Sequence, residues 1–281
     1  MSDTMNEFTS PDMVDTNDAG FLNSNGIVAK LVFLIMVVIG FVVVFYISLM
    51  IMGWFNSSSS NPMLIDGQIN GSTYTMVSQN PANSASKSIM RSNNQASGIE
   101  FTWSVWLNYQ DSPSEKKYNP VFIKGDNTRT NDYGSVNHGP GVYFGKNGDN
   151  PNTLHILMDT VTHSATQVEI IVIPNLLIGT YFHLGVRCQN TFIDVYINGT
   201  LVKRQNLGNA PKQNYYNVHV CPHGGFSGTL SNLQYFDRAL SVVELNSIVQ
   251  AGPNMRTIAG TPFSYDSVNV MSTSWYNNFL L

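Results

Sequence analysis

The chain has 281 residues, of which only 11% are charged, and its formal net charge is −4. Typical soluble domains carry about 25% charged residues. No stretch rich in Lys or Arg is present, so the chain lacks the basic footprint of a nucleic-acid-binding protein and we expect no nucleic-acid partner. Residues 1–29 hold five acidic residues and no basic one, and this polar composition predicts an acidic tail without a core.

A long apolar stretch follows, from Leu31 to Met52, without a charged residue or a proline. At about 1.5 Å per residue a helix of this length crosses the ~30 Å hydrocarbon core of a bilayer. It has no polar face, unlike the surface helix of a soluble domain. We therefore predict one transmembrane helix over residues 30–54, with the bilayer as partner. The side chains expected to face lipid include Leu31, Phe33, Ile39, Phe41, Phe45 and Met52.

The alternative for this stretch is a cleaved signal peptide, whose apolar core is shorter and follows basic residues. Here the apolar run is long and follows an acidic tail. Lys30 is the one basic residue near the predicted membrane border, and the next is Lys87. The positive-inside rule thus favours an N-terminus on the inner side by a single charge.

Residues 55–85 are dominated by Ser, Asn, Pro and Gly, which predicts a flexible spacer. Short strands near residues 64–65 and 74–77 are the alternative. Asn56 and Asn70 begin Asn-x-Ser/Thr glycosylation motifs here, and Asn198 begins a third. In a chain rich in Asn, Ser and Thr such triplets also arise by chance.

Residues 86–250 show the pattern of an antiparallel β-sandwich. Between residues 99 and 109, Phe101, Trp103 and Val105 alternate with polar positions, a period of two that is typical of a strand. Similar short apolar runs recur every 8–12 residues, with no alternation of strands and helices that would indicate a parallel sheet. The expected runs are 120–124, 141–145, 154–158, 168–173, 181–188, 192–197, 200–205, 218–221 and 226–236.

Two local motifs support this organisation. Asn198-Gly199 lies between two of the runs and predicts a hairpin, since both turn residues need positive φ. Ser241 and Glu244 form a capping box that begins a short helix ending near Gln250. Residues 251–281 form a tail with several aromatics, for which we expect packing on the sandwich or the spacer, with docking into a neighbouring subunit as the alternative.

Four segments resemble the laminin-G-like branch of the concanavalin A-like lectin/glucanase family. They are FTWSVWL from Phe101, VFIKG from Val121, HLGV from His183 together with IDVYINGTLV from Ile193 and its Asn-Gly hairpin, and Phe226–Leu245 with the closing strand and capped helix. The resemblance covers residues 86–250 and implies a jelly-roll sandwich. The expected fold class is therefore all-β, an antiparallel concanavalin A-like sandwich with one short C-terminal helix, preceded by the transmembrane helix.

This family includes glycan binders, adhesion modules, glycosidases and structural modules, so fold alone does not settle function. Glycosidases of the fold place two carboxylates close together on one strand. Glu100, Glu169, Asp194 and Asp237 each lack a second acid within five residues. We therefore expect no enzymatic activity, with glycoside hydrolysis as the less favoured alternative.

Binding residues are expected in loops and at strand ends. A calcium site is conceivable at Asp126, Asp132 and Asp149, although solvated turns explain these acids as well and we expect no cofactor. Candidate glycan contacts are the rim side chains Tyr133, His138, Tyr143, Tyr215 and Tyr216. Cys188 and Cys221 are the only cysteines, and they form either one disulfide or two buried thiols.

Low charge, high Asn content and a sandwich on an anchor together resemble virion proteins of large double-stranded DNA viruses of algae and protists. That resemblance implies a minor capsid protein of the inner virion membrane, with coat subunits as partners of the sandwich. The alternative is a lectin of the cell surface or secretory membranes that binds glycans for attachment.

Overall fold

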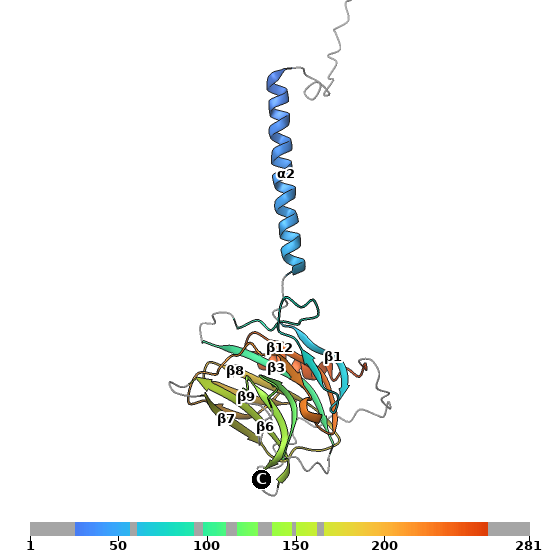
Figure 1. Ribbon diagram of the computed structural model, residues 1–281, viewed down its shortest axis with the longest axis vertical. Helices are drawn as coiled ribbons and strands as arrows, with labels where there is room; N and C mark the ends of the chain where they lie inside the picture. Colours follow the sequence, from blue (N-terminus) through green and yellow to red (C-terminus); the bar gives the residue numbers. More distant parts are fainter. Residues whose placement is uncertain are drawn as a thin grey trace, which may run out of the picture. The chain divides into compact units, whose positions relative to one another are not determined.

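The computed structural model describes residues 26–56, 61–92, 98–110, 117–128, 137–147, 150–161 and 166–257 (Figure 1). The chain divides into two compact units, residues 1–57 and residues 58–281. The described part of the first unit is a helix, and that of the second is a β-sandwich with one short α-helix. The predicted antiparallel sandwich is therefore confirmed. The acidic tail over residues 1–25 lies outside the described residues.

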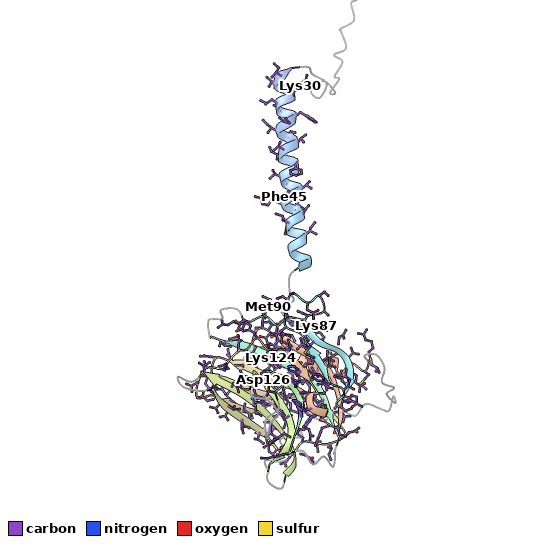
Figure 2. All side chains as sticks on the ribbon, viewed as in Figure 1. Lys30, Phe45, Lys87, Met90, Lys124 and Asp126 are labelled. Carbon is purple, nitrogen blue, oxygen red and sulfur yellow. The ribbon has the colours of Figure 1, made fainter. Side chains whose placement is uncertain are left out.

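Helix α2 runs from Ile27 to Asn56, slightly longer than the predicted span 30–54. The predicted lipid-facing side chains Leu31, Phe33, Ile39, Phe41 and Phe45 are all exposed, whereas nothing is described for the side chain of Met52. Figure 2 labels Lys30 and Phe45 near the start and middle of this helix.

A helix satisfies its own backbone hydrogen bonds, as lipid requires, and polar side chains can bond to its carbonyls. The hydroxyl of Ser48, for example, donates to the carbonyl of Val44 at 2.8 Å. The helix is long and apolar enough between Ile27 and Ile51 to cross a membrane. A signal sequence near the N-terminus can meet the same criterion of length and composition, so the structure establishes an apolar helix and not by itself a membrane anchor.

Two six-stranded antiparallel sheets form the second unit. The strand order is β1-β12-β3-β8-β9-β10 in one sheet and β2-β11-β4-β5-β6-β7 in the other. The strands of the first sheet are β1 (Met63–Asn70), β12 (Gly228–Phe236), β3 (Glu100–Tyr109), β8 (Tyr181–Gln189), β9 (Phe192–Ile197) and β10 (Thr200–Asn206). Those of the second are β2 (Thr75–Val77), β11 (Val218–Val220), β4 (Tyr118–Lys124), β5 (Gly141–Asn147), β6 (Asn150–Val161) and β7 (Thr166–Ile173).

The core lies between the two sheets and is rich in aromatics. The ring of Trp103 on β3 lies 5.1 Å from that of Phe122 on β4 and 5.1 Å from that of Tyr235 on β12. Trp106, on the opposite face of β3, is also buried, and its ring packs edge-on against His183. Both faces of β3 are therefore covered, although its sequence alternates as a half-exposed strand would.

Helix α3, Val242–Ala251, helps to cover that second face, since Leu245 is fully buried beside Tyr196. The predicted capping box is present: the Glu244 amide donates to the Ser241 hydroxyl at 3.3 Å, and the Ser241 amide donates to the Glu244 carboxylate at 2.8 Å. The predicted hairpin is present as well, with φ of 48° at Asn198 and 77° at Gly199. A 3-10 helix, η1 (Pro222–Gly224), follows β11.

The spacer prediction for residues 55–85 is wrong over β1 and β2, which belong to the two sheets. The alternative of short strands near residues 64–65 and 74–77 is confirmed. Leu64, Ile65 and Ile69 of β1 are buried in the core. Gly67 interrupts their alternation at an irregularity in the register, where φ is 113°. The sandwich therefore begins before residue 86.

The start of the C-terminal tail packs on β1, as expected. Thr257 forms a parallel bridge with Gln68, and the Gln68 amide donates to the carbonyl of Arg256 at 2.8 Å. Arg256 also pairs with Asp66 at 3.0 Å. The aromatic residues of the tail lie beyond residue 257, outside the described residues.

Candidate functional site

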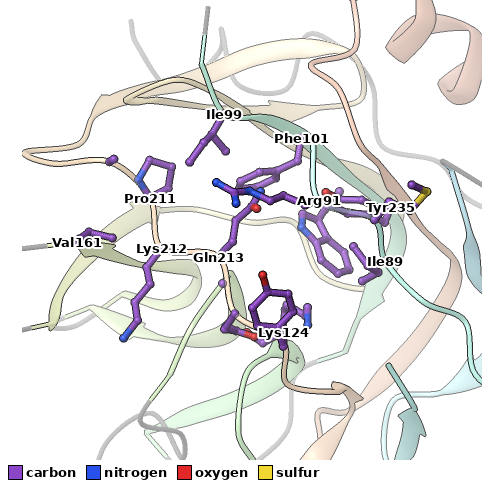
Figure 3. A pocket seen from close by; sticks show the side chains of 16 residues that line it. Ile89, Arg91, Ile99, Phe101, Lys124, Val161, Pro211, Lys212, Gln213 and Tyr235 are labelled. Carbon is purple, nitrogen blue, oxygen red and sulfur yellow. The ribbon is translucent and has the colours of Figure 1, made fainter. Parts of the chain in front are cut away.

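A pocket of about 360 Å³ opens where the two sheets meet a strap, residues 87–92, and a loop, residues 210–216 (Figure 3). Its inner wall is aromatic, because Trp103, Phe101 and Tyr235 point into it from β3 and β12. These rings are held by the core contacts of Trp103. The remaining lining side chains come from Ile89, Met90, Arg91, Ile99, Lys124, Val161, Ala210, Pro211, Lys212, Gln213, Asn214 and Tyr215, with Gly139 adding backbone.

The loop wall is joined to the ends of β4 and β6. The Val161 amide donates to the carbonyl of Ala210 at 2.9 Å, and the Lys212 amide donates to the carbonyl of Asp159 at 2.7 Å. The Asn214 side chain donates to the carbonyl of Lys124 at 2.9 Å. These bonds place the loop side chains before any ligand arrives, and such preorganisation lowers the entropy cost of binding.

The strap wall is held by one of its own side chains, Lys87, and by the side chain of Gln79. Lys87, labelled with Met90 in Figure 2, donates from its ammonium to the carbonyls of Met63 at 2.8 Å and Leu64 at 3.1 Å. The side chain of Gln79 accepts from the Ile89 amide at 2.7 Å and donates to the Lys87 carbonyl at 3.0 Å. Arg91 follows directly on this fixed stretch.

Three cationic side chains line the pocket: Arg91, Lys124 and Lys212. No Asp or Glu is among the described residues that line it. Lys124 is only 6% exposed, and its ammonium donates to the carbonyl of Tyr216. Burial lowers the pKa of Lys124 from 10.5 to about 8, because the protein interior solvates the charged amine less well than water does.

The predicted glycan contacts separate into two groups. Tyr215 is 91% exposed and lines the pocket, and Tyr216 beside it is about half-exposed. His138 and Tyr143 are buried, so their placement on an open rim is corrected. Tyr133 lies outside the described residues.

His138 belongs to a buried polar cluster at the start of β5. The Nε2 atom of His138 lies 3.1 Å from the Tyr143 hydroxyl, and its Nδ1 atom lies 3.5 Å from a carboxylate oxygen of Asp159. The His138 amide also donates to Asp159 at 3.1 Å. Tyr143 packs with Ile123 and Leu157 in a small cluster of its own.

Of the three predicted calcium ligands, Asp126 alone is described. Its carboxylate accepts from the Thr128 amide at 3.1 Å and from the Asn137 side chain at 2.6 Å, as expected of a turn residue. Asp132 and Asp149 lie outside the described residues. Within the described ranges no group of three His, Cys, Asp or Glu side chains is arranged to hold a metal ion. The calcium site therefore stays a prediction.

The two cysteines are both buried as free thiols, which is the second of the two predicted alternatives. Cys188 lies on β8, and Cys221 directly follows β11 in the other sheet. Burial, with Glu100 and Asp194 adding to it, raises the pKa of Cys188 to about 12. Burial raises the pKa of Cys221 as well.

The four acids considered for glycoside hydrolysis do not line the pocket. Asp194 is buried and pairs with two arginines, Arg187 at 3.0 Å and Arg204 at 2.6 Å. Glu169 accepts from the Gly208 amide at 3.4 Å.

Sequence reasoning missed the cations and the aromatic wall of the pocket. The one local signal was Lys124-Gly125 at the end of a strand, within a segment of the family resemblance. Lys212 and Tyr215 are about 90 residues further along the chain, so no local spacing indicates that they share a site with Lys124.

The Laminin_G_3 family model, described as the concanavalin A-like lectin/glucanases superfamily, matches residues 82–246. No curated protein matches the sequence. Among solved structures, the receptor-binding domain of botulinum neurotoxin C/D mosaic serotype is 10% identical, with a TM-score of 0.42 over 55% of this chain and 36% of that one. The binding domain of botulinum neurotoxin serotype G is 12% identical, with a TM-score of 0.43 over 66% of this chain and 46% of that one.

This chain thus spans less than half the length of those solved chains, and such TM-scores carry no inference about ligands. The family match, by contrast, covers more than half of the chain, from the strap before β3 to the middle of α3. It includes every strand of the two sheets except β1 and β2, and all of the residues that line the pocket. The chain belongs to the concanavalin A-like lectin/glucanases superfamily.

Proposed function

We propose that this chain is a membrane-anchored, non-enzymatic module that binds carbohydrate in the pocket between the strap and the 210–216 loop. The observation that carries the proposal is the make-up of this pocket. The exposed ring of Tyr215 provides a face for a sugar ring, and Gln213 and Asn214 beside it provide amide donors and acceptors. A few polar groups placed on a mostly apolar wall are typical of small-molecule sites.

The size of the pocket supports a short saccharide. Its volume of about 360 Å³ is near the lower end of the ~300–1,000 Å³ range of ligand pockets. That space suits one terminal sugar unit better than an extended chain. The lectin members of the family make saccharides the first ligand class to test.

Helix α2 has the surface expected of a membrane anchor. Most of its side chains from Leu31 to Ile51 are exposed and apolar, and water is an unfavourable surrounding for such a surface. A bilayer buries these side chains and leaves the backbone bonds intact. The single basic residue at the border, Lys30, favours an N-terminus on the inner side, with the sandwich on the outer side, as on a cell surface.

The test is a glycan array probed with the full chain in lipid nanodiscs. We expect a subset of glycans to bind, and Tyr215→Ala to weaken that binding about tenfold, equal to ~1.4 kcal/mol. The matched control is Phe192→Ala, which removes an aromatic ring of similar kind on β9, where Phe192 is 44% exposed and outside the pocket. Absence of binding to any glycan, or equal losses in both variants, would overturn the proposal.

A second candidate is a structural tether, such as a minor virion protein that joins an internal membrane to coat subunits. The support for this candidate is an exposed apolar edge of the sandwich, formed by β7 and β10. β7 and β10 are end strands of the two sheets and lie close together, since Lys203 donates to the carbonyl of Val172 at 3.4 Å. They expose the apolar side chains Val168, Ile170 and Leu201. Exposed edges with apolar side chains are sites of protein contact.

This candidate is tested by cross-linking mass spectrometry in native membranes, with Lys203 as the reporter of the β10 edge. A tether is expected to cross-link to one abundant coat protein in fixed stoichiometry. A control variant, Lys203→Arg, removes the amine that the reagent needs and keeps the charge. If no stoichiometric neighbour is found, the tether is excluded and the carbohydrate-binding proposal is unaffected.

A further inference from the structure

We infer that the pocket selects an acidic sugar, whose carboxylate is received by Lys124 and Arg91. This inference rests on the proposed function, because it specifies the class of saccharide for the same site. It begins with the Lys124 ammonium, which is a charged group at the pocket wall with only 6% of the residue exposed. Buried charges in proteins are ordinarily paired.

Lys124 is incompletely satisfied by the protein. An ammonium has three N–H donors, and within the described part of the chain the Lys124 ammonium donates to one acceptor, the carbonyl of Tyr216. That carbonyl is neutral, and no carboxylate of the described residues forms an ion pair with Lys124. A carboxylate entering the pocket would supply both the missing acceptor and the missing charge.

The other ionic side chains of the pocket are also positively charged. Arg91 and Lys212 also line the pocket, which therefore concentrates positive charge in a chain of net charge −4. Among the described residues, Arg91 forms no ion pair with a carboxylate of the protein. Its guanidinium is the side chain best shaped to hold a carboxylate through two parallel hydrogen bonds.

The aromatic part of the pocket lining disfavours a ligand that is charged throughout. Trp103, Phe101 and Tyr235 are apolar surfaces, and Tyr215 is an exposed ring at the opening. An acidic sugar combines the two requirements, since it has an anionic end for the cations and a ring face for the aromatics. An inorganic anion would leave the aromatic wall without a contact.

The experiment compares sugars that differ only in the acidic group, using the full chain in lipid nanodiscs and calorimetric titration. The probes are methyl glucuronide against methyl glucoside, and methyl galacturonide against methyl galactoside. We expect at least one acidic member to bind about tenfold or more tightly than its neutral partner, the scale of one charge-assisted hydrogen bond. That preference should weaken as salt is raised.

Two variants test the contributions of Lys124 and Arg91 to the acidic preference. Lys124→Met keeps the volume and removes the buried charge, and Arg91→Gln removes a charge on the exposed strap, where misfolding is not a concern. Both are expected to reduce the acidic preference, which is the ratio of acidic-sugar to neutral-sugar affinity, about tenfold. The control Lys203→Gln removes the same charge on β10, outside the pocket, and should leave the preference intact.

The outcomes distinguish this inference from the function on which it rests. Equal binding of acidic and neutral sugars overturns the acidic preference and leaves carbohydrate binding standing. A preference that Lys203→Gln reduces as much as Arg91→Gln reflects net charge and also overturns the assignment to the pocket. If no saccharide on the array or in the titrations binds, the proposed function itself fails.

Discussion

The buried ammonium of Lys124 donates a hydrogen bond to the main-chain carbonyl of Tyr216, and this contact joins the end of β4 to the loop before β11. It fixes one wall of the pocket to the sheet. It also keeps a charged amine in a poorly solvated place, and burial lowers its pKa from 10.5 to about 8. The charge of this side chain is therefore tied to both stability and binding.

The first prediction concerns pH. In the unfolded chain Lys124 keeps its proton up to about pH 10.5, whereas in the folded chain it loses the proton near pH 8. Because the unfolded state then binds more protons, the free energy of unfolding should rise between these two values. For a shift of this size the gain is on the order of 3 kcal/mol.

The measurement is denaturant unfolding of the full chain in nanodiscs at several pH values, compared with Lys124→Met. Other titrating groups are common to both proteins, so the difference between the two curves isolates Lys124. The wild type should gain stability relative to the variant as the pH rises from 8. Parallel curves would show that the folded-state pKa is not depressed.

A second prediction concerns the buried carboxylate of Asp194, held by Arg187 at 3.0 Å and Arg204 at 2.6 Å. Asp194→Ala leaves the partly buried Arg187 without its counter-ion, and we expect a loss of about 3–5 kcal/mol of stability. The control is Arg256→Gln, which breaks the exposed pair with Asp66 and should cost less than about 1 kcal/mol. Similar losses in both variants would contradict the role given to Asp194.

The strands of the sandwich were predictable because aromatic and β-branched residues repeat with a period of two, and turns separate the repeats. Strand β1 was predicted only as an alternative limited to residues 64–65, because Gly67 breaks the alternation and Gln68 looks like a surface residue. The structure buries Gln68 instead, and its side chain donates to the Tyr181 hydroxyl. Tyr181 is remote in the sequence, so the burial of this polar residue has no local signal.

The candidate site was predictable only in part, for a similar reason. Tyr215 was identified because exposed aromatics in loops are typical of binding rims. Lys124 was not identified, because a lysine at a strand end is usually solvated, and its burial depends on the distant loop 210–216. Tyr143 was misplaced since its strand, β5, is buried on both faces.

A third prediction concerns thiol reactivity. Only the thiolate reacts with alkylating or disulfide reagents, and burial raises the pKa of both cysteines, of Cys188 to about 12. Neither thiol should react appreciably with maleimide in the folded chain at neutral pH. Both should react once the chain is unfolded in guanidinium without a reductant.

Mass spectrometry of the labelled peptides reads out each cysteine separately. Two modified cysteines after unfolding confirm free thiols. Labelling that requires a reductant would show a disulfide between Cys188 and Cys221, contrary to the structure. Rapid labelling of the folded chain would show that at least one thiol is more accessible than its buried position allows.

The last prediction concerns the glycosylation motifs. The side chain of Asn198 is buried, and its carbonyl oxygen accepts from the His183 amide at 2.7 Å. A glycan on its nitrogen has no room in the fold, because the residue is only 2% exposed. Asn70 is partly exposed at the turn after β1, where its side chain accepts from the Ser72 amide at 2.9 Å.

When the full chain is expressed in a glycosylating host, the protease-resistant, folded fraction should therefore carry no glycan at Asn198, whereas Asn70 is sterically able to accept one. Glycopeptide mass spectrometry of that fraction measures both sites, and Asn70→Gln serves as the control that removes the accessible motif. A folded fraction glycosylated at Asn198 would mean that the β9–β10 hairpin does not pack against β8 as described. Since glycosylation occurs on one side of the membrane, occupancy of Asn70 would also place the sandwich on the outer side, in keeping with the orientation that Lys30 favours.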